Sequence, residues 1–455
     1  MNEKHNTLLK VALYTGLVLL TACATTSNPT RTATEDDARC NQNEASCNVL
    51  GGYYGNTIAN EVTGATISGG GLRGAPNQII GNHGTVSGGE GNVAGEGSTV
   101  GGGSGNTAEH FHAAVGGGAN NLANAQEATV AGGFKNTASE RFTTVGGGAL
   151  NVASDMNATV SGGSGNVASD RFSTVGGGTQ NSAGNVGAVV AGGDHNLAQG
   201  TYSSILGGLN NTAGGYLATI GGGAGNEATG PYAAIPGGFA NSAGGDYSFA
   251  AGRGARVDAN HPGVFLFADS SGFPFPSLAP NEFAVRAVGG ARFVTGVDSS
   301  GNPTSGVRLS PGSGTWESLS DYNAKAGFAP VDGHQVLEQL MSIPISTWHY
   351  RSQDPSIRHI GPMAQDFHTA FKVGQDDRYI STVDEEGVAL AAIQELYRMV
   401  QQKNAQMAAS QPEDLQQQKQ IASLERRLAF SNGLTVASFL ISILALWRRA
   451  LIKKK

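Results

Sequence analysis

The chain has 455 residues, of which 69 are glycine; 14% are charged and the formal net charge is −7. This acidic balance argues against a protein that binds nucleic acid through a basic face. The glycines recur at a strict period, which argues against a disordered low-complexity chain.

The N-terminus has the pattern of a secretory signal peptide over residues 1–22. Lys4 and Lys10 flank the start of an apolar run at 11–20, and a small-residue site follows it. Leu-Thr-Ala-Cys at 20–23 resembles a bacterial lipobox, in which Cys23 would be lipidated; an ordinary signal peptide with a chance cysteine is the alternative. The residue after this cysteine is Ala24, and in this the sequence resembles lipoproteins that are sorted to the outer membrane. We therefore expect an exported protein of the bacterial cell envelope.

Residues 23–60 form a polar tether that contains the two other cysteines, Cys40 and Cys47. In an exported protein, an even pair this close in sequence is a candidate for a small-loop disulfide. The pair lacks histidine partners at zinc-finger spacing, so we expect no metal site.

A repeat of fifteen residues fills positions 61–256. An apolar residue is followed by one usually small residue and Gly-Gly, an asparagine comes six residues after the apolar one, and an alanine comes two residues later. The apolar positions are Val86, Val100, Val115, Val130, Val145, Val160, Val175, Val190, Ile205, Ile220 and Ile235. The asparagines are Asn92, Asn106, Asn121, Asn136, Asn151, Asn166, Asn181, Asn196, Asn211, Asn226 and Asn241.

The repeat predicts a parallel β-roll in which equivalent residues stack in columns. With coils about 4.8 Å apart, eleven coils make a rod of roughly 50 Å. Glycine and asparagine are expected at the corners because both tolerate positive φ. Each coil has few large apolar residues, so one chain is expected to leave a flank uncovered that three chains would cover. The array resembles the heads of trimeric autotransporter adhesins. We identify no catalytic set within it.

Residues 257–316 are predicted to form a β-rich neck. Aromatic residues cluster at 264–268 and 282–286, and further strand-like runs occur at 291–295 and 307–309 between turn residues.

A serine and a lysine lie five residues apart at the end of this neck, in the sequence W-E-S-L-S-D-Y-N-A-K at 316–325. A serine hydroxyl becomes a nucleophile when a base removes its proton, and a lysine can be that base if burial or a nearby cation lowers its pKa. Ser320 and Lys325 are therefore candidate catalytic residues, although most such pairs are solvated surface. Asp321 is a candidate supporting residue.

Two further blocks follow, R-H-I-G-P-M-A-Q-D-F at 358–367 and D-E-E-G-V-A-L-A-A-I-Q-E-L at 384–396. In this order the three blocks resemble the S74 peptidase family over 317–403. This family comprises the intramolecular chaperones of phage tail spikes, endosialidases and myelin regulatory factor. The resemblance implies a homotrimer whose C-terminal domain assists folding and then cuts itself off at Leu319–Ser320. Gln365 would help to shape the site. Ala324 replaces a larger apolar residue of many members, which affects the expected cleavage efficiency.

The C-terminal part predicts helices. A helix pattern at 336–341 and an extended run at 345–350 precede an amphipathic helix from about Val388. Ala389, Ile393, Leu396, Val400 and Met407 follow a four-three spacing that is typical of a coiled coil. Pro412 is expected to interrupt it, and a coiled-coil stalk is predicted over 404–430.

Residues 428–447 contain no charged side chain and are followed by Arg448, Arg449 and three lysines. This pattern predicts a transmembrane helix at 431–450 with a cytoplasmic basic end. The alternatives are a membrane-surface helix and a buried trimer stalk.

The sequence thus predicts a mainly β protein without cofactors: a trimeric, membrane-anchored envelope fibre with an adhesin-like rod and a single-turnover serine peptidase of the S74 type. The alternative is a non-cleaving structural or adhesive trimer, anchored at both ends, in which the S74-like domain acts only as a clamp. A polysaccharide-degrading spike is disfavoured, because the uniform repeat offers no place for a carboxylate pair.

Overall fold

The computed structural model describes residues 46–452, and the chain divides into two compact units, Met1–Gly289 and Gly290–Lys455. The predicted signal peptide, Cys23 and Cys40 lie outside the described residues.

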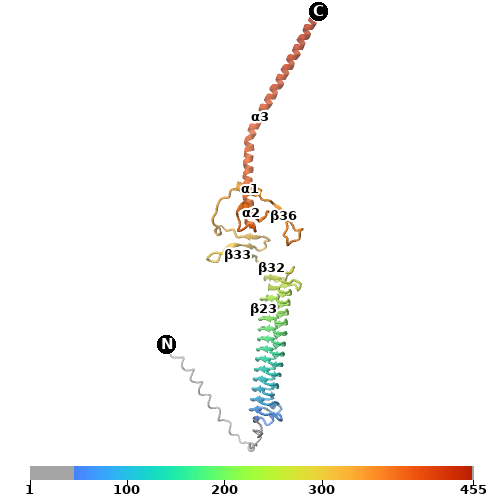
Figure 1. Cartoon of the computed structure of the whole chain (residues 1–455), viewed down its shortest axis with the longest axis vertical. Coiled ribbons are helices and arrows are strands. Elements are labelled where there is room, and N and C mark those ends of the chain that lie inside the picture. Colours follow the sequence, from blue (N-terminus) through green and yellow to red (C-terminus); the bar gives the residue numbers. More distant parts are fainter. Residues whose placement is uncertain (1–45, 453–455) are drawn as a thin grey trace, which may run out of the picture. The chain divides into compact units, whose positions relative to one another are not determined.

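The described part of the first unit is a parallel β-solenoid whose short strands stack into a rod (Figure 1). One sheet has 17 strands: β1 (Val49–Leu50), β3 (Thr66–Ile67), β5 (Thr85–Val86), β7 (Thr99–Val100), β9 (Ala114–Val115), β11 (Thr129–Val130), β13 (Thr144–Val145), β15 (Thr159–Val160), β17 (Thr174–Val175), β19 (Val189–Val190), β21 (Ser204–Ile205), β23 (Thr219–Ile220), β25 (Ala234–Ile235), β26 (Gly238–Phe239), β28 (Phe249–Arg253), β30 (Phe265–Ala268) and β32 (Phe283–Arg286). The other has 15: β2 (Thr57–Ile58), β4 (Gln78–Ile79), β6 (Val93–Ala94), β8 (Thr107–Ala108), β10 (Leu122–Ala123), β12 (Thr137–Ala138), β14 (Val152–Ala153), β16 (Val167–Ala168), β18 (Ser182–Ala183), β20 (Leu197–Ala198), β22 (Thr212–Ala213), β24 (Glu227–Ala228), β27 (Ser242–Ala243), β29 (Ala255–Val257) and β31 (Phe275–Pro276).

Each coil pairs in register with the next. In the first sheet, for example, Thr144 pairs with Thr159 and Val145 with Val160. Within each two-residue strand of the repeat, the second residue points inward, because successive side chains of a strand alternate between its two faces. The predicted parallel β-roll is therefore confirmed.

The interior of the rod is closed within one chain. Val145, Asn151 and Ala153 of one coil are all 0% exposed, and their equivalents in neighbouring coils stack on them. This core closes within one chain because small residues let the coil close on itself. Large apolar side chains such as Phe172, which is 57% exposed, remain on the surface of the single chain.

The repeat asparagines form a buried ladder. The side-chain nitrogen of Asn136 donates to the carbonyls of Gly132, at 2.8 Å, and Gly148, at 2.9 Å. Its side-chain oxygen accepts the backbone N–H of Asn151 at 3.0 Å. None of the eleven repeat asparagines has positive φ, so the expected reason for asparagine at these positions is wrong. Positive φ falls instead on glycines such as Gly148, at +86°, and on residues of other types such as Leu150, at +60°. A Cβ at Gly148 would lie 2.8 Å from the side-chain amide nitrogen of Asn151.

The solenoid continues beyond the regular repeat, into the segment predicted as a neck. Phe249, Phe265 and Phe283 stack in successive coils, with ring centroids 4.5 and 4.9 Å apart. Beside them Arg286 donates to Asp269 at 3.0 Å.

The second unit begins with an antiparallel sheet of β33 (Ala291–Val297), β34 (Pro303–Leu309) and β35 (Trp316–Ser318). The short helix η1 (Tyr322–Ala324) follows, then α1 (Gly333–Ser342), β36 (Ser346–Trp348), β37 (His359–Gly361) and α2 (Ala364–Phe371). Strands β36 and β37 pair antiparallel, and α1 packs against α2 and α3 (Thr382–Ile452).

Pro412 lies inside α3, so the expected interruption is wrong. Proline leaves one backbone carbonyl without its helical donor, here that of Ala408. Ala408 is exposed, so water can hydrogen-bond to this carbonyl. By length and composition, α3 contains a stretch that could cross a membrane.

Candidate active site

The candidate site lies on the segment that leaves the three-stranded sheet. Strand β35 ends at Ser318, and Leu319 and Ser320 come next. The side-chain nitrogen of Lys325 donates to the Ser320 hydroxyl, with 2.6 Å between Nζ and Oγ. The two residues that the sequence singled out are thus in direct contact.

Asp321 shapes the turn between these two residues. It is the N-cap of η1, and its side-chain oxygen accepts the backbone N–H of Asn323 at 2.7 Å. This single helical turn brings Lys325 back toward Ser320. Asp321 therefore has a structural part in the site, as an N-cap.

An aromatic pair closes the loop that carries Lys325. The rings of Tyr322 and Phe328 are stacked, with centroids 4.6 Å apart and planes 4° from parallel. Both side chains are exposed in the single chain. The stacking links the two sides of Lys325, so it restricts the conformations open to the lysine backbone.

The upstream side of the Leu319–Ser320 bond is held by strand pairing. Val307 pairs with Ser318, and the backbone N–H of Leu319 continues the ladder with a 2.9 Å hydrogen bond to the Gly306 carbonyl. The Arg308 guanidinium lies 2.6 Å from the Glu317 carboxylate and, with a weaker contribution from the Ser310 hydroxyl, holds the pKa of Glu317 below its usual value.

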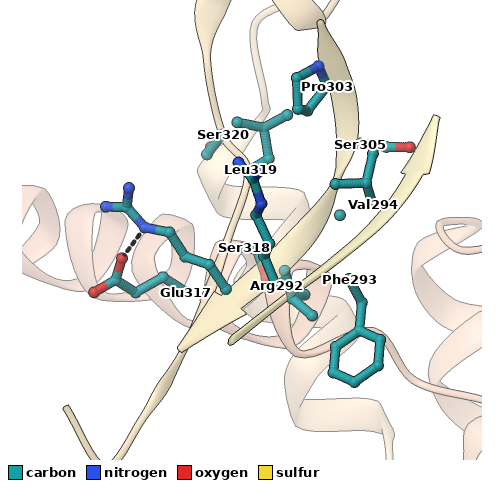
Figure 2. A pocket seen from close by; sticks show the side chains of 12 residues that line it. Arg292, Phe293, Val294, Pro303, Ser305, Glu317, Ser318, Leu319 and Ser320 are labelled. Carbon is teal, nitrogen blue, oxygen red and sulfur yellow. Dashed lines mark hydrogen bonds and ion pairs between the residues drawn. The ribbon is translucent and has the colours of Figure 1, made fainter. Parts of the chain in front are cut away.

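A cavity of about 370 Å³ adjoins this bond. Figure 2 shows Leu319 and Ser320 beside residues of β33 and β34. The residues that line the cavity are Arg292, Phe293, Val294, Pro303, Ser305, Gly306, Val307, Arg308, Glu317, Ser318, Leu319 and Ser320.

Ser320 and Lys325 are both exposed to solvent in the single chain. A lysine acts as a base only where its surroundings disfavour the charged form, mainly by excluding water. Within the described residues of one chain this requirement is not met.

The other predicted residues lie apart from this pair. Gln365 is exposed on α2, and within residues 46–452 no hydrogen bond joins it to Ser320 or Lys325. Cys47 is disulfide-bonded; its pairing with Cys40 stays a prediction. Across the described part of the chain, no group of three or more His, Cys, Asp or Glu residues could hold a metal ion.

Sequence reasoning missed Gly306, Arg308 and Glu317, which hold the upstream side of the bond. The strand-like run at 307–309 was recognised. The pairing of this run with β35 could not be predicted, because a turn of six residues does not by itself fix the register of the two strands.

The comparison with protein families agrees with the sequence blocks. Residues 320–373 match the peptidase S74 family, described as the chaperone of endosialidase. The chain thus carries an S74-type chaperone domain downstream of a parallel β-solenoid. The matched segment begins at Ser320 and includes the second block, whereas the third block, at 384–396, lies beyond it. The comparison with curated proteins found no match.

Proposed function

We propose that this chain is a trimeric, exported fibre of the cell envelope whose S74-type domain drives trimerisation and folding and then cleaves the chain at Leu319–Ser320. The single observation that carries the cleavage is the 2.6 Å contact between Lys325 Nζ and Ser320 Oγ. A hydroxyl in contact with an amine is the arrangement that a serine nucleophile with a lysine base requires.

The reaction is an N-to-O acyl shift. The neutral Lys325 amine takes the proton of the Ser320 hydroxyl, and Oγ bonds to the Leu319 carbonyl carbon. The bond between that carbon and the Ser320 nitrogen then breaks, and the proton passes from the lysine to the leaving amine. Water hydrolyses the resulting ester, which leaves a carboxylate on Leu319 and restores the Ser320 hydroxyl. Each chain reacts once, so the reaction controls assembly.

Exposed apolar residues on α3 support the trimer. Ile393, Leu396 and Val400 are 62%, 53% and 47% exposed and follow the predicted coiled-coil spacing. Three such helices would bury these side chains against each other. The same assembly could cover Ser320 and Lys325 and exclude water from them, so that cleavage would follow trimerisation.

The membrane attachments are part of the same proposal. The apolar end of α3 would anchor the uncut chain in the inner membrane, and a lipid on Cys23 would hold the mature rod. Cleavage would then release the rod from α3.

A second candidate is a trimer that does not cut and keeps both anchors. The exposure of Ser320 and Lys325 in the single chain favours it. If the trimer leaves the pair in water, the chain stays whole and the domain acts only as a clamp.

The test is a blot against a C-terminal tag on the full chain in membranes. Wild type is expected to yield a fragment of 136 residues, from 320 to 455, whereas Ser320→Ala and Lys325→Arg stay whole. Ser318→Ala is the matched control and is expected to cut. A wild-type trimer that stays whole would favour the non-cleaving clamp.

A further inference from the structure

The chain segment before the proposed cleavage bond is fixed at one edge of the three-stranded sheet. Leu319 supplies the carbonyl that Ser320 would attack, and its own N–H is held by the Gly306 carbonyl at 2.9 Å. On the other side of the bond, Lys325 holds the attacking hydroxyl. One contact therefore lies on each side of the bond.

Gly306 has a backbone conformation that other residues rarely adopt. Its φ is +146°, and a Cβ at this position would fall on the carbonyl oxygen of Phe293 and lie 3.0 Å from the Cα of Val294. Strand β33 is irregular opposite this point, with a register shift between Val294 and Gly296. Glycine is thus required where β34 passes close to β33.

The charged pair next to it fixes the same strand. Arg308 and Glu317 are directly opposite each other in the ladder, and their side chains are 2.6 Å apart. Opposite charges at such a position favour one register of the strand pair. A slip by one residue would turn Leu319 to the other face of the sheet and move its carbonyl away from Ser320.

We propose that Gly306, together with the Arg308–Glu317 pair, positions the Leu319 carbonyl for attack by Ser320. These are positioning residues, since none of them touches the reacting atoms. The inference rests on the proposed self-cleavage. Its physical reason is that an acyl shift is fast only when the carbonyl carbon and the hydroxyl oxygen are held in near-attack geometry.

The first test compares Gly306→Ala with Gly314→Ala in the full chain. A Cβ added at Gly314 would have no neighbouring atom within 4 Å, so this residue is a matched control in the turn before β35. Gly306→Ala is expected to slow release of the 320–455 fragment by at least tenfold. Gly314→Ala should cut within twofold of wild type. The pH at which the rate is half-maximal should not change in Gly306→Ala, because the serine and lysine remain in place.

Hydrogen–deuterium exchange supplies a measurement that does not depend on cleavage. In the uncut Ser320→Ala chain, peptides covering 316–325 are expected to exchange faster when Gly306→Ala is added, and unchanged when Gly314→Ala is added. If wild type never cuts, the proposed cleavage fails, but this exchange difference still decides whether Gly306 holds the segment. Equal exchange, or a Gly306→Ala chain that cuts within twofold of wild type, overturns the inference.

If Gly306→Ala prevents trimer formation, reversing the charges of Arg308 and Glu317 tests the positioning role instead. Glu317→Arg alone places two cations opposite each other and is expected to slow cleavage several-fold. Adding Arg308→Glu restores the opposite pair and should restore the rate. A double variant that is no faster than the single one would contradict the positioning role.

Discussion

The side-chain oxygen of Asn121 accepts the backbone N–H of Asn136 at 3.0 Å, one coil further along the solenoid. The amide nitrogen of Asn121 donates at the same time to the carbonyls of Gly117 and Gly133, each at 2.9 Å. Each ladder asparagine thus ties its own coil to the next one through both ends of its amide.

We expect Asn136→Ala to destabilise the rod by about 3 kcal/mol, because it leaves the buried Asn151 N–H and the Gly132 carbonyl without a partner and removes one of the two hydrogen bonds to the Gly148 carbonyl. Chemical unfolding of the full chain in detergent, followed by circular dichroism, measures this. Asn124→Ala is the matched control, since Asn124 is exposed and lies outside the ladder. Equal unfolding midpoints for the two variants would contradict a stabilising ladder.

The stacked rings of Tyr322 and Phe328 should increase the rate of cleavage. An aromatic pair contributes about 0.5–1.5 kcal/mol, so Tyr322→Ala is expected to slow release of the fragment by roughly two- to tenfold. Tyr322→Phe keeps the ring and should cut at the wild-type rate. Tyr379→Ala removes a tyrosine that is 75% exposed and serves as the control. A Tyr322→Ala chain as fast as Tyr379→Ala would show that the loop needs no ring contact.

The fold of the repeat could be predicted because its period determines which residues align. Val145 and Val160 are fifteen residues apart, and a strict period places them in one column of the solenoid. The role of the asparagines could not be predicted in the same way. Their tolerance of positive φ suggested corners, whereas the amide of Asn136 bonds the carbonyls of Gly132 and Gly148. Alignment along the axis does not reveal the direction of a side chain.

In the candidate site, too, one part could be predicted from the sequence and another could not. Ser320 and Lys325 are close in sequence, and one helical turn suffices to bring them together. Gly306 is fourteen residues from Ser320, and its conformation depends on an irregular pairing with β33. A glycine outside the repeat carries no periodic signal, so its contact with Leu319 appeared only with the strand register.

Asp269 makes the end of the solenoid sensitive to acid. Hydrogen bonds from the Ser271 hydroxyl, from the Val288 and Ser271 amides and from Arg286 hold the pKa of Asp269 well below its usual value. Because the pKa is lower in the folded than in the unfolded chain, this carboxylate stabilises the fold above the ordinary aspartate value of about 3.9. The contribution declines as the pH falls below that value toward the folded-state pKa.

Asp269→Asn is therefore expected to melt at a lower temperature than wild type at pH 7, and the difference should shrink as the pH falls from about 5 to about 2. Circular dichroism melts of the full chain across this range test the expectation. Asp246→Asn is the control, because Asp246 is exposed and its carboxylate makes no hydrogen bond within the described residues. A difference between Asp269→Asn and wild type that stays constant with pH would exclude the titration of Asp269 as its cause.

The apolar face of α3 should decide the oligomeric state. Ile393 is 62% exposed in the single chain, and burying such a side chain stabilises an assembly by about 1.5–3 kcal/mol per copy. We expect Ile393→Asp to shift the detergent-solubilised chain from trimer to monomer, as measured by light scattering after size exclusion. It should also abolish cleavage, because the monomer leaves Ser320 and Lys325 in water. Gln394→Asp adds the same charge at the next exposed position and should remain a trimer. A trimeric Ile393→Asp chain would mean that another surface holds the three copies together.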